Sequence, residues 1–331
     1  MKLSLSPRWR DSALALAVLS AGLGACGGGG GGGGSPPASP AVINSGNAAA
    51  ITQEVVGVGL GAGAFGDAIG GGGILSADGG SNALALGTMR RTTAAQRVQP
   101  SARFGPTVSE CLVSGSLVLS GSLNSDVTLT RGDRIDVDAN GCDDGAGAVY
   151  DGGMTIVVTS FSGDILRDQY LLGADFTLAG FTVTEGNETT IGDGAVELEL
   201  DLTEPLVSEI TMAGPRLDFR SGSDAWILRD FAVSVVEDSR GVNLLTRSAG
   251  TGTLEGSGFE GAVDFVTVLP FVATGDDYPA SGEVLITGAS GATIRATALN
   301  PATLQLAIDL DGDSVVDETQ QIPWSSVVGP G

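Results

Sequence analysis

Residues 196–202 read Val-Glu-Leu-Glu-Leu-Asp-Leu, with an apolar side chain at every second position and an acidic one between. Successive side chains of a β-strand point to opposite faces, so this stretch predicts a strand with one buried and one solvated face. Similar alternation occurs in residues 154–158, 231–235 and 304–310, and Gly, Asp, Asn and Ser separate such runs. From residue 112 onward, the pattern therefore predicts about a dozen antiparallel strands.

No helical period of useful length interrupts these runs, so alternating strands and helices with a parallel sheet are not expected. The predicted fold class is all-β, with antiparallel strands in a sandwich, an open half-barrel or two sheets in tandem. The alternation does not separate these arrangements, because it assigns the faces of a strand and leaves its neighbours undetermined.

The first 25 residues have the composition of an export signal. Lys2, Arg8 and Arg10 make the start basic, and an apolar stretch of about 11 residues follows. A membrane-spanning helix needs roughly 20 apolar residues, so the stretch indicates the core of a signal peptide. Residues 1–25 are therefore expected to be absent from the mature fold.

The signal ends in Leu23-Gly24-Ala25-Cys26, which resembles the lipobox of bacterial lipoproteins. The resemblance implies that Cys26 carries a lipid, becomes the new N-terminus and holds the protein on a membrane of the cell envelope. By the sorting rule of that family, the residue after the cysteine, a glycine here, implies the periplasmic face of the outer membrane. Other envelope membranes, and an ordinary signal peptide that ends near a cysteine, remain open alternatives.

Two segments separate the lipobox from the predicted strands. Residues 26–46 hold a run of glycines followed by serines and prolines, which is typical of a flexible tether. Residues 47–106 are of low complexity, and Ile51, Val55 and Val56 have near-helical spacing within them. We expect at most one short helix there, placed to dock on a β-rich body of residues 107–331, which is one large domain or two β subdomains.

Cys111 and Cys142 remain once Cys26 is assigned to the lipid. In an oxidising compartment this even pair predicts a disulfide. Closing a loop of about 31 residues is worth about 3–4 kcal/mol in the chain-entropy model. A metal or redox role for the pair is the alternative.

The composition excludes several function classes. The chain has no histidine, and its one lysine is Lys2, so histidine-based hydrolases, histidine-ligated zinc sites and lysine Schiff bases are not expected. The net charge of −23 argues against nucleic acid as a partner. We expect a non-enzymatic binding or structural module for an unknown protein or glycan ligand. The alternative is a hydrolase of envelope glycans that uses two carboxylates.

One segment near the C-terminus has the spacing of a metal-binding loop. Alternate residues offer oxygen atoms to one ion, as in the calcium loops that this segment resembles, those of EF-hand, dockerin and thrombospondin-repeat proteins. The candidate ligands are Asp309, Asp311, Asp313, the carbonyl of Val315, and Asp317. The match is incomplete, because Ser314 stands where a glycine is usual and Gln320 where a glutamate is usual. A β-hairpin that turns at Asp311 and Gly312, with the other aspartates solvated, is the alternative.

The last part of the chain, from Tyr278 to Trp324, includes Pro-Ala-Ser-Gly at 279–282, Ile-Thr-Gly-Ala at 286–289 and the aspartate-rich loop. It resembles the C-terminal end of uncharacterised β-rich envelope lipoproteins of proteobacteria. That resemblance agrees with the lipobox and implies no activity.

Overall fold

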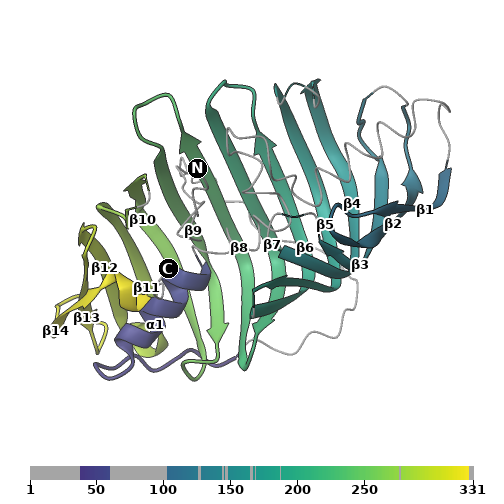
Figure 1. The fold of residues 1–331 in the computed structure, drawn as a ribbon. Helices are drawn as coiled ribbons and strands as arrows, with labels where there is room; N and C mark the ends of the chain where they lie inside the picture. The colour runs from purple at the N-terminus through teal and green to yellow at the C-terminus, as the bar shows by residue number, and fades with distance from the viewer. Residues whose placement is uncertain are drawn as a thin grey trace, which may run out of the picture.

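The chain folds into one antiparallel sheet of fourteen strands, in which each strand pairs with the next along the sequence (Figure 1). The computed structural model describes residues 38–59, 103–125, 128–143, 145, 148–164, 167, 169–186, 188–275 and 277–327. The strands are β1 Arg103–Glu110, β2 Ser114–Ser122, β3 Arg134–Asp143, β4 Ala148–Asp164, β5 Gln169–Glu185, β6 Glu188–Asp201, β7 Val207–Ser221, β8 Asp224–Asp238, β9 Leu245–Gly256, β10 Ala262–Thr274, β11 Ser281–Thr287, β12 Thr293–Asn300, β13 Thr303–Asp309 and β14 Glu318–Pro323.

The predicted all-β antiparallel fold is confirmed, and it takes the form of a single open sheet. β1 and β14 are its two edges, and the sheet curls without closing into a barrel (Figure 1). The first strand begins at Arg103, a little before the expected start of the β-rich body at residue 107.

Alternation places the apolar side of each strand in the core. In β6, Val196, Leu198 and Leu200 are buried, whereas Glu197 and Glu199 are exposed. Buried side chains from β2 to β13 belong to one connected hydrophobic cluster. The regular period of two thus gives the sheet one apolar face from β2 to β13.

The long central strands depart from the period of two at β-bulges. In β5, Leu178 and Phe181 are both buried although they are three residues apart, and the pairing with β6 shifts between them. In β8, Leu228 and Phe231 repeat this spacing across Asp230, which has a φ of 45°. An extra residue in one strand keeps the apolar side chains on the same face on both sides of a bulge.

The short helix expected upstream of the sheet is present as α1, Ala48–Glu54, and continues into the π-helical turn η1, Val55–Gly59. Ile51 and Val55 are fully buried, and α1 packs against β12, β13 and the short helix α4, Trp324–Val327 (Figure 1). The helix therefore docks on the strands that are last in the sequence and not on the first ones.

Residues 39–57, which we call the strap, are attached by hydrogen bonds to the end of the sheet that contains β10–β14. The Ala41 nitrogen donates to the Ala262 oxygen at 2.7 Å, and the Ala289 nitrogen donates to the Ala41 oxygen at 2.7 Å. The Gln320 side chain donates to the Ser45 oxygen at 2.9 Å. Part of the expected tether of residues 26–46 is therefore hydrogen-bonded to the sheet. Ala41 is small enough to be enclosed, at 1% exposure, between β10 and the short η3 turn, Ala289–Gly291.

Candidate functional site

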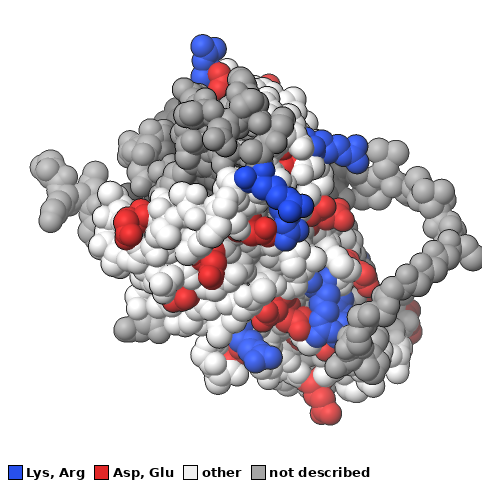
Figure 2. All heavy atoms as spheres, turned by 90° about the vertical axis from the view of Figure 1, so that its right-hand side faces the viewer, with Lys and Arg blue, Asp and Glu red and all other residues white. Residues whose placement is uncertain are grey.

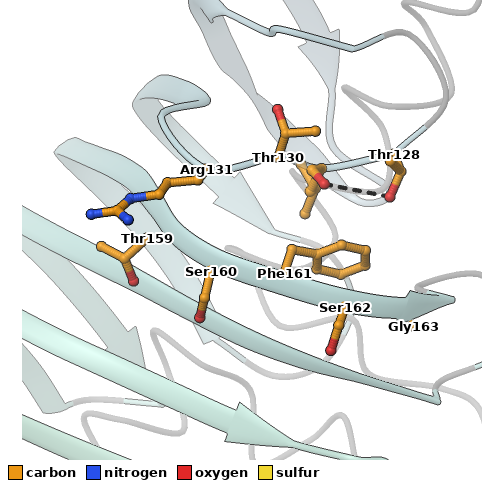
Figure 3. A pocket seen from close by; sticks show the side chains of 9 residues that line it. Thr128, Thr130, Arg131, Thr159, Ser160, Phe161, Ser162 and Gly163 are labelled. Carbon is orange, nitrogen blue, oxygen red and sulfur yellow. Dashed lines mark hydrogen bonds between the residues drawn. The ribbon is translucent and has the colours of Figure 1, made fainter.

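An open hollow of about 630 Å³ lies where β4 extends past its neighbour β3 (Figure 3). The last bonds between the two chain segments are from the Gly132 nitrogen to the Val158 oxygen, 2.8 Å, and from the Val158 nitrogen to the Asp133 oxygen, 2.9 Å. Beyond them, residues 128–131 line one side of the hollow and residues 159–163 of β4 line the other. Its volume is within the range of about 300–1,000 Å³ that is usual for ligand pockets.

The loop on one side of the hollow is organised by Asp133, whose side chain is fully buried. One carboxylate oxygen accepts from the Asn124 nitrogen at 2.7 Å and from the Thr130 hydroxyl at 3.0 Å, and the other accepts from the Thr130 nitrogen at 2.7 Å. A buried carboxylate needs such donors to replace water. These bonds fix the backbone on both sides of Arg131 and so set where its side chain begins.

A bulge organises the opposite side. The pairing of β4 with β5 shifts between Val158 and Ser160, and Ser160 lies across from Gly173. The Ser160 Oγ and Thr159 Oγ1 lie 2.5 and 2.8 Å from the place that a Cβ on Gly173 would occupy. The two hydroxyls therefore share the space that the missing side chain leaves free.

The lining of the hollow combines hydroxyl groups, one aromatic ring and one cation. Figure 3 shows the Arg131 side chain extending from its loop toward Thr159, whereas the Phe161 ring lies farther along β4. Phe161 is half-buried and stacks on Tyr170, with ring centroids 6.0 Å apart. Arg131 is exposed and forms no ion pair with the described residues, although the chain has a net charge of −23.

This side of the molecule carries both signs of charge. Figure 2 views the molecule from its β1 end and shows basic and acidic side chains interspersed there. Arg134, close to the hollow in sequence, is held by Asp136 at 2.6 Å. The guanidinium of Arg134 is therefore occupied, whereas that of Arg131 is available to a ligand.

The structure brings three of the predicted calcium ligands together. Carboxylate oxygens of Asp309, Asp311 and Asp317 lie within 4.8 Å of one another in the connection between β13 and β14. Asp309 is 6% exposed, and its two oxygens accept from the Gly312 nitrogen at 2.7 Å and the Ser314 nitrogen at 2.8 Å. The flanking segments are the strands β13 and β14, as expected for the β-hairpin alternative.

The other predicted ligands are oriented differently. Asp313 is outside the three-carboxylate group and accepts from the nitrogen of Val315 at 2.8 Å, and Val315 is 61% exposed. Asp317 accepts from the Leu310 nitrogen at 2.7 Å. The loop is thus a β-hairpin connection whose aspartates bind backbone donors, and calcium binding stays a prediction.

Cys111 and Cys142 form the predicted disulfide pair, with Cα atoms 5.5 Å apart. Cys111 lies between β1 and β2, and Cys142 is fully buried near the end of β3. The bond ties the edge of the sheet to its third strand. Cys26, the predicted lipidation site, lies outside the described residues.

The acidic side of the stretch that begins at Val196 forms a stripe on the outer face of the sheet. Directly paired positions carry like charges, Asp175 opposite Glu197 and Asp201 opposite Glu209. Burial raises the pKa of Glu209, and the neighbouring Asp201 and a second acidic residue of β6 raise it further. Like charges directly opposite each other are destabilising, so this stripe keeps the face solvated at some cost in stability.

Arg131, Thr159 and Ser160 were not identified as site residues from the sequence. They come from two separate segments, and no spacing rule connects them. The turn-forming Gly-Asp pair at 132–133 is the only local signal, and it predicts a loop without indicating what the loop faces.

Comparison of the chain with protein-family models, with curated proteins and with solved structures gives no match. Among the residues that the structure describes, no helix has the length and apolar character needed to cross a membrane.

Proposed function

We propose that this chain is a lipid-anchored protein of the bacterial cell envelope, attached through Cys26, whose open sheet is a non-enzymatic binding module. The observation that supports it best is the docked strap. Only residues 27–38 separate Cys26 from the strap, and a flexible chain of that length spans about 20 Å on average. The strap is bonded to β10 and β14, so a lipid on Cys26 would hold that end of the sheet near the membrane.

In the proposed orientation, the hollow faces away from the membrane. The strap covers the end of the sheet formed by β10–β14, and the hollow is at β4, toward the opposite end (Figure 1). An anchored protein of this shape presents the β1–β4 end to the surrounding space. This is the position in which a binding surface reaches a partner that is not in the membrane.

The lining of the hollow favours binding over hydrolysis. A glycosidase needs two carboxyl groups about 5–10 Å apart across its substrate. The described residues that line the hollow, among them Thr159, Phe161 and Arg131, include no carboxylate. They therefore supply neither a general acid nor a nucleophilic carboxylate.

Membrane fractionation tests the anchor. Cys26→Ser should move the protein from the membrane pellet to the soluble fraction and abolish incorporation of a labelled fatty acid. The matched control replaces the other two cysteines, Cys111→Ser with Cys142→Ser, and should keep both the label and the membrane location. Unchanged fractionation of the Cys26→Ser protein would refute the anchor.

The proposed orientation has its own test. A fluorophore on Val42→Cys, a strap position that is 68% exposed, should be quenched strongly by quencher-labelled lipid in vesicles that carry the lipidated protein. A fluorophore on Arg167→Cys, where the side chain is 79% exposed beyond the end of β4, should be quenched much less. Equal quenching at both positions would contradict the orientation and leave the anchor itself intact.

A further inference from the structure

We infer that the outer face of β10 and β11 lies on the bilayer to which the chain is anchored and inserts apolar side chains among the lipids. The inference rests on the proposed lipid anchor and adds the surface by which the anchored body meets the membrane. That surface is the apolar patch, formed by Val266, Val268 and Leu269 of β10 and Leu285 of β11. Its exposure, its distance from the tether and the pairing of the charges around it support the inference.

The apolar patch is contiguous and faces away from the core. Val266, Val268 and Leu269 are 45%, 46% and 57% exposed, whereas Phe265 of the same strand is buried. Val266 lies directly across from Leu285, and the pairing of β10 with β11 shifts on both sides of Leu269. The bulge thus gives β10 three exposed apolar side chains within four positions. Exposed apolar side chains are common one at a time, but a contiguous group of them indicates a surface that contacts a partner or a membrane.

The described chain enters the body on this same face of the sheet. The Ala262 nitrogen, at the start of β10, donates to the Ser39 oxygen at 2.9 Å. The Ala38 nitrogen donates to a carboxylate oxygen of Glu255 at 3.4 Å. Glu255 follows the fully buried Leu254 in β9, so its side chain points to the outer face. The strap therefore begins on the outer face, beside the strand that carries most of the apolar patch.

The apolar patch lies within reach of the membrane anchor. Val266 is four residues beyond Ala262 along β10, which is about 13 Å in a β-strand. Residues 27–38, as a flexible chain between Cys26 and the strap, span about 20 Å on average. A lipid on Cys26 can thus be inserted in the bilayer while the apolar patch touches its surface. Apolar side chains held at that surface bury themselves in the boundary between headgroups and acyl chains.

The charges next to the apolar patch are paired, which lowers the cost of bringing them to the bilayer. Glu283 of β11 forms an ion pair with Arg295 of β12 and accepts from the Thr297 hydroxyl at 3.2 Å. Asp264 of β10 accepts from the Thr253 hydroxyl at 2.6 Å. The outer face of β5–β7 carries instead the acidic stripe, where like charges lie opposite each other. An anionic bilayer repels that stripe more than the patch, so electrostatics turns the β10–β11 side toward the lipid.

The test places a polarity-sensitive fluorophore on the full lipidated chain in vesicles of phosphatidylethanolamine with a minor share of phosphatidylglycerol. The native cysteines are in the disulfide or at the lipidation site, so an introduced thiol is labelled alone. A fluorophore on Val268→Cys should be quenched by brominated lipid at least about threefold more than one on Glu197→Cys in the acidic stripe. Val242→Cys, at an apolar position that is 103% exposed between β8 and β9, should resemble Glu197→Cys. Equal quenching at Val268→Cys and Glu197→Cys would overturn the inference.

A charge placed in the apolar patch tests the same contact by its loss. With the fluorophore on Val266→Cys of the lipidated chain, Val268→Asp should reduce quenching at least about twofold, because a carboxylate resists transfer to the bilayer. Val242→Asp is the matched control and should leave quenching unchanged, and thermal melts establish that both variants are folded. Quenching should persist in concentrated salt. Its disappearance there would overturn apolar insertion in favour of an electrostatic contact.

The other occupant that fits such a patch is a second copy of the chain. Sedimentation velocity of the unlipidated Cys26→Ser protein should show a monomer. A dimer that Val268→Asp converts to a monomer would overturn the membrane contact. A wild-type protein that sediments with vesicles and yet shows no excess quenching at the apolar patch would refute this inference and leave the proposed anchor in place. A wild-type protein that does not sediment with vesicles would refute both.

Discussion

The two ends of the sheet are completed in different ways. At the β10–β14 end, a strap from far upstream in the sequence covers the strands, and Trp324 is fully enclosed. At the β1–β4 end, a disulfide ties the edge, and the hollow beside β4 is open to solvent. One end is sealed by apolar packing, and the other is held by a covalent bond and a polar loop. The open end is therefore the one with room for a ligand.

The sealed end should contain the largest single contribution to stability. Trp324 packs edge-on against Phe271, stacks over Tyr278 and donates its indole N–H to the Asn300 oxygen at 3.2 Å. Trp324→Ala should lower the free energy of unfolding by about 4 kcal/mol, as measured by urea denaturation. Phe161→Ala at the open end is the comparison and should cost less, because that ring is only half-buried. Equal losses would contradict the contrast between the two ends.

The open end should depend on its disulfide. Replacing Cys111 and Cys142 together by serine should lower the free energy of unfolding by about 3 kcal/mol, because the unfolded chain regains the freedom of a loop of that length. The same loss should follow when the wild-type protein is unfolded in a reducing agent. Proteolysis within β1–β3 should become faster than proteolysis within β11–β13. Uniform cleavage along the sheet would show that the bond does not act locally.

The β13–β14 connection should be stable without an ion. Asp309→Ala removes a buried carboxylate that accepts from the nitrogens of Gly312 and Ser314, so the loss of two charge-assisted hydrogen bonds should cost about 2 kcal/mol even in a chelator. Asp311→Ala, at an exposed position of the same group, should cost less than about 0.5 kcal/mol under those conditions. Thermal melts with chelator and with millimolar calcium make the measurement. A loss from Asp309→Ala that appears only with calcium would instead assign the stability of the loop to a bound ion.

Local patterns in the sequence predicted the parts of the fold that depend on one segment at a time. The alternation of Val196, Leu198 and Leu200 gave the correct strand and the correct buried face. The spacing of Ile51 and Val55 gave the one helix that docks on the body. These predictions succeed because each element has a single apolar side, and the side chains of that element define it.

Such patterns could not predict the features that depend on two distant segments. Strand pairing determines that there is a single open sheet, where the strap docks and where the hollow forms. The alternation of apolar residues does not indicate which strands are neighbours. Leu129 shows the limit, because it is buried as a strand residue would be and yet lies in the loop beside the hollow. The bulge at Thr159 likewise depends on its partner, since Gly173 of β5 provides the space for the two hydroxyls.

The smallest expected effect concerns the carboxylate of Glu54, which lies at the end of α1 within the strap. Glu54 accepts from the Gly258 nitrogen at 2.6 Å, and its other oxygen is buried. Burial raises the pKa of Glu54 above 4.5, and the nearby Asp224 raises it further, whereas hydrogen bonding to Gly258 and Trp226 opposes that rise. The folded state thus favours the protonated form, so this contribution to stability is present below pH 4.5 and is lost as the pH rises through the raised pKa.

Glu54→Gln should therefore raise the thermal midpoint slightly at pH 7, because glutamine keeps an oxygen for Gly258 and removes the buried charge. Near pH 4 the two proteins should melt together, since the glutamate is then protonated. Glu260→Gln, at an exposed position close to the same turn, should change neither midpoint. A Glu54→Gln protein that is less stable at pH 7 would mean that the charge itself holds the strap. The attachment of the strap to the β10–β14 end would then depend on an electrostatic contact as well as on the packing around α1.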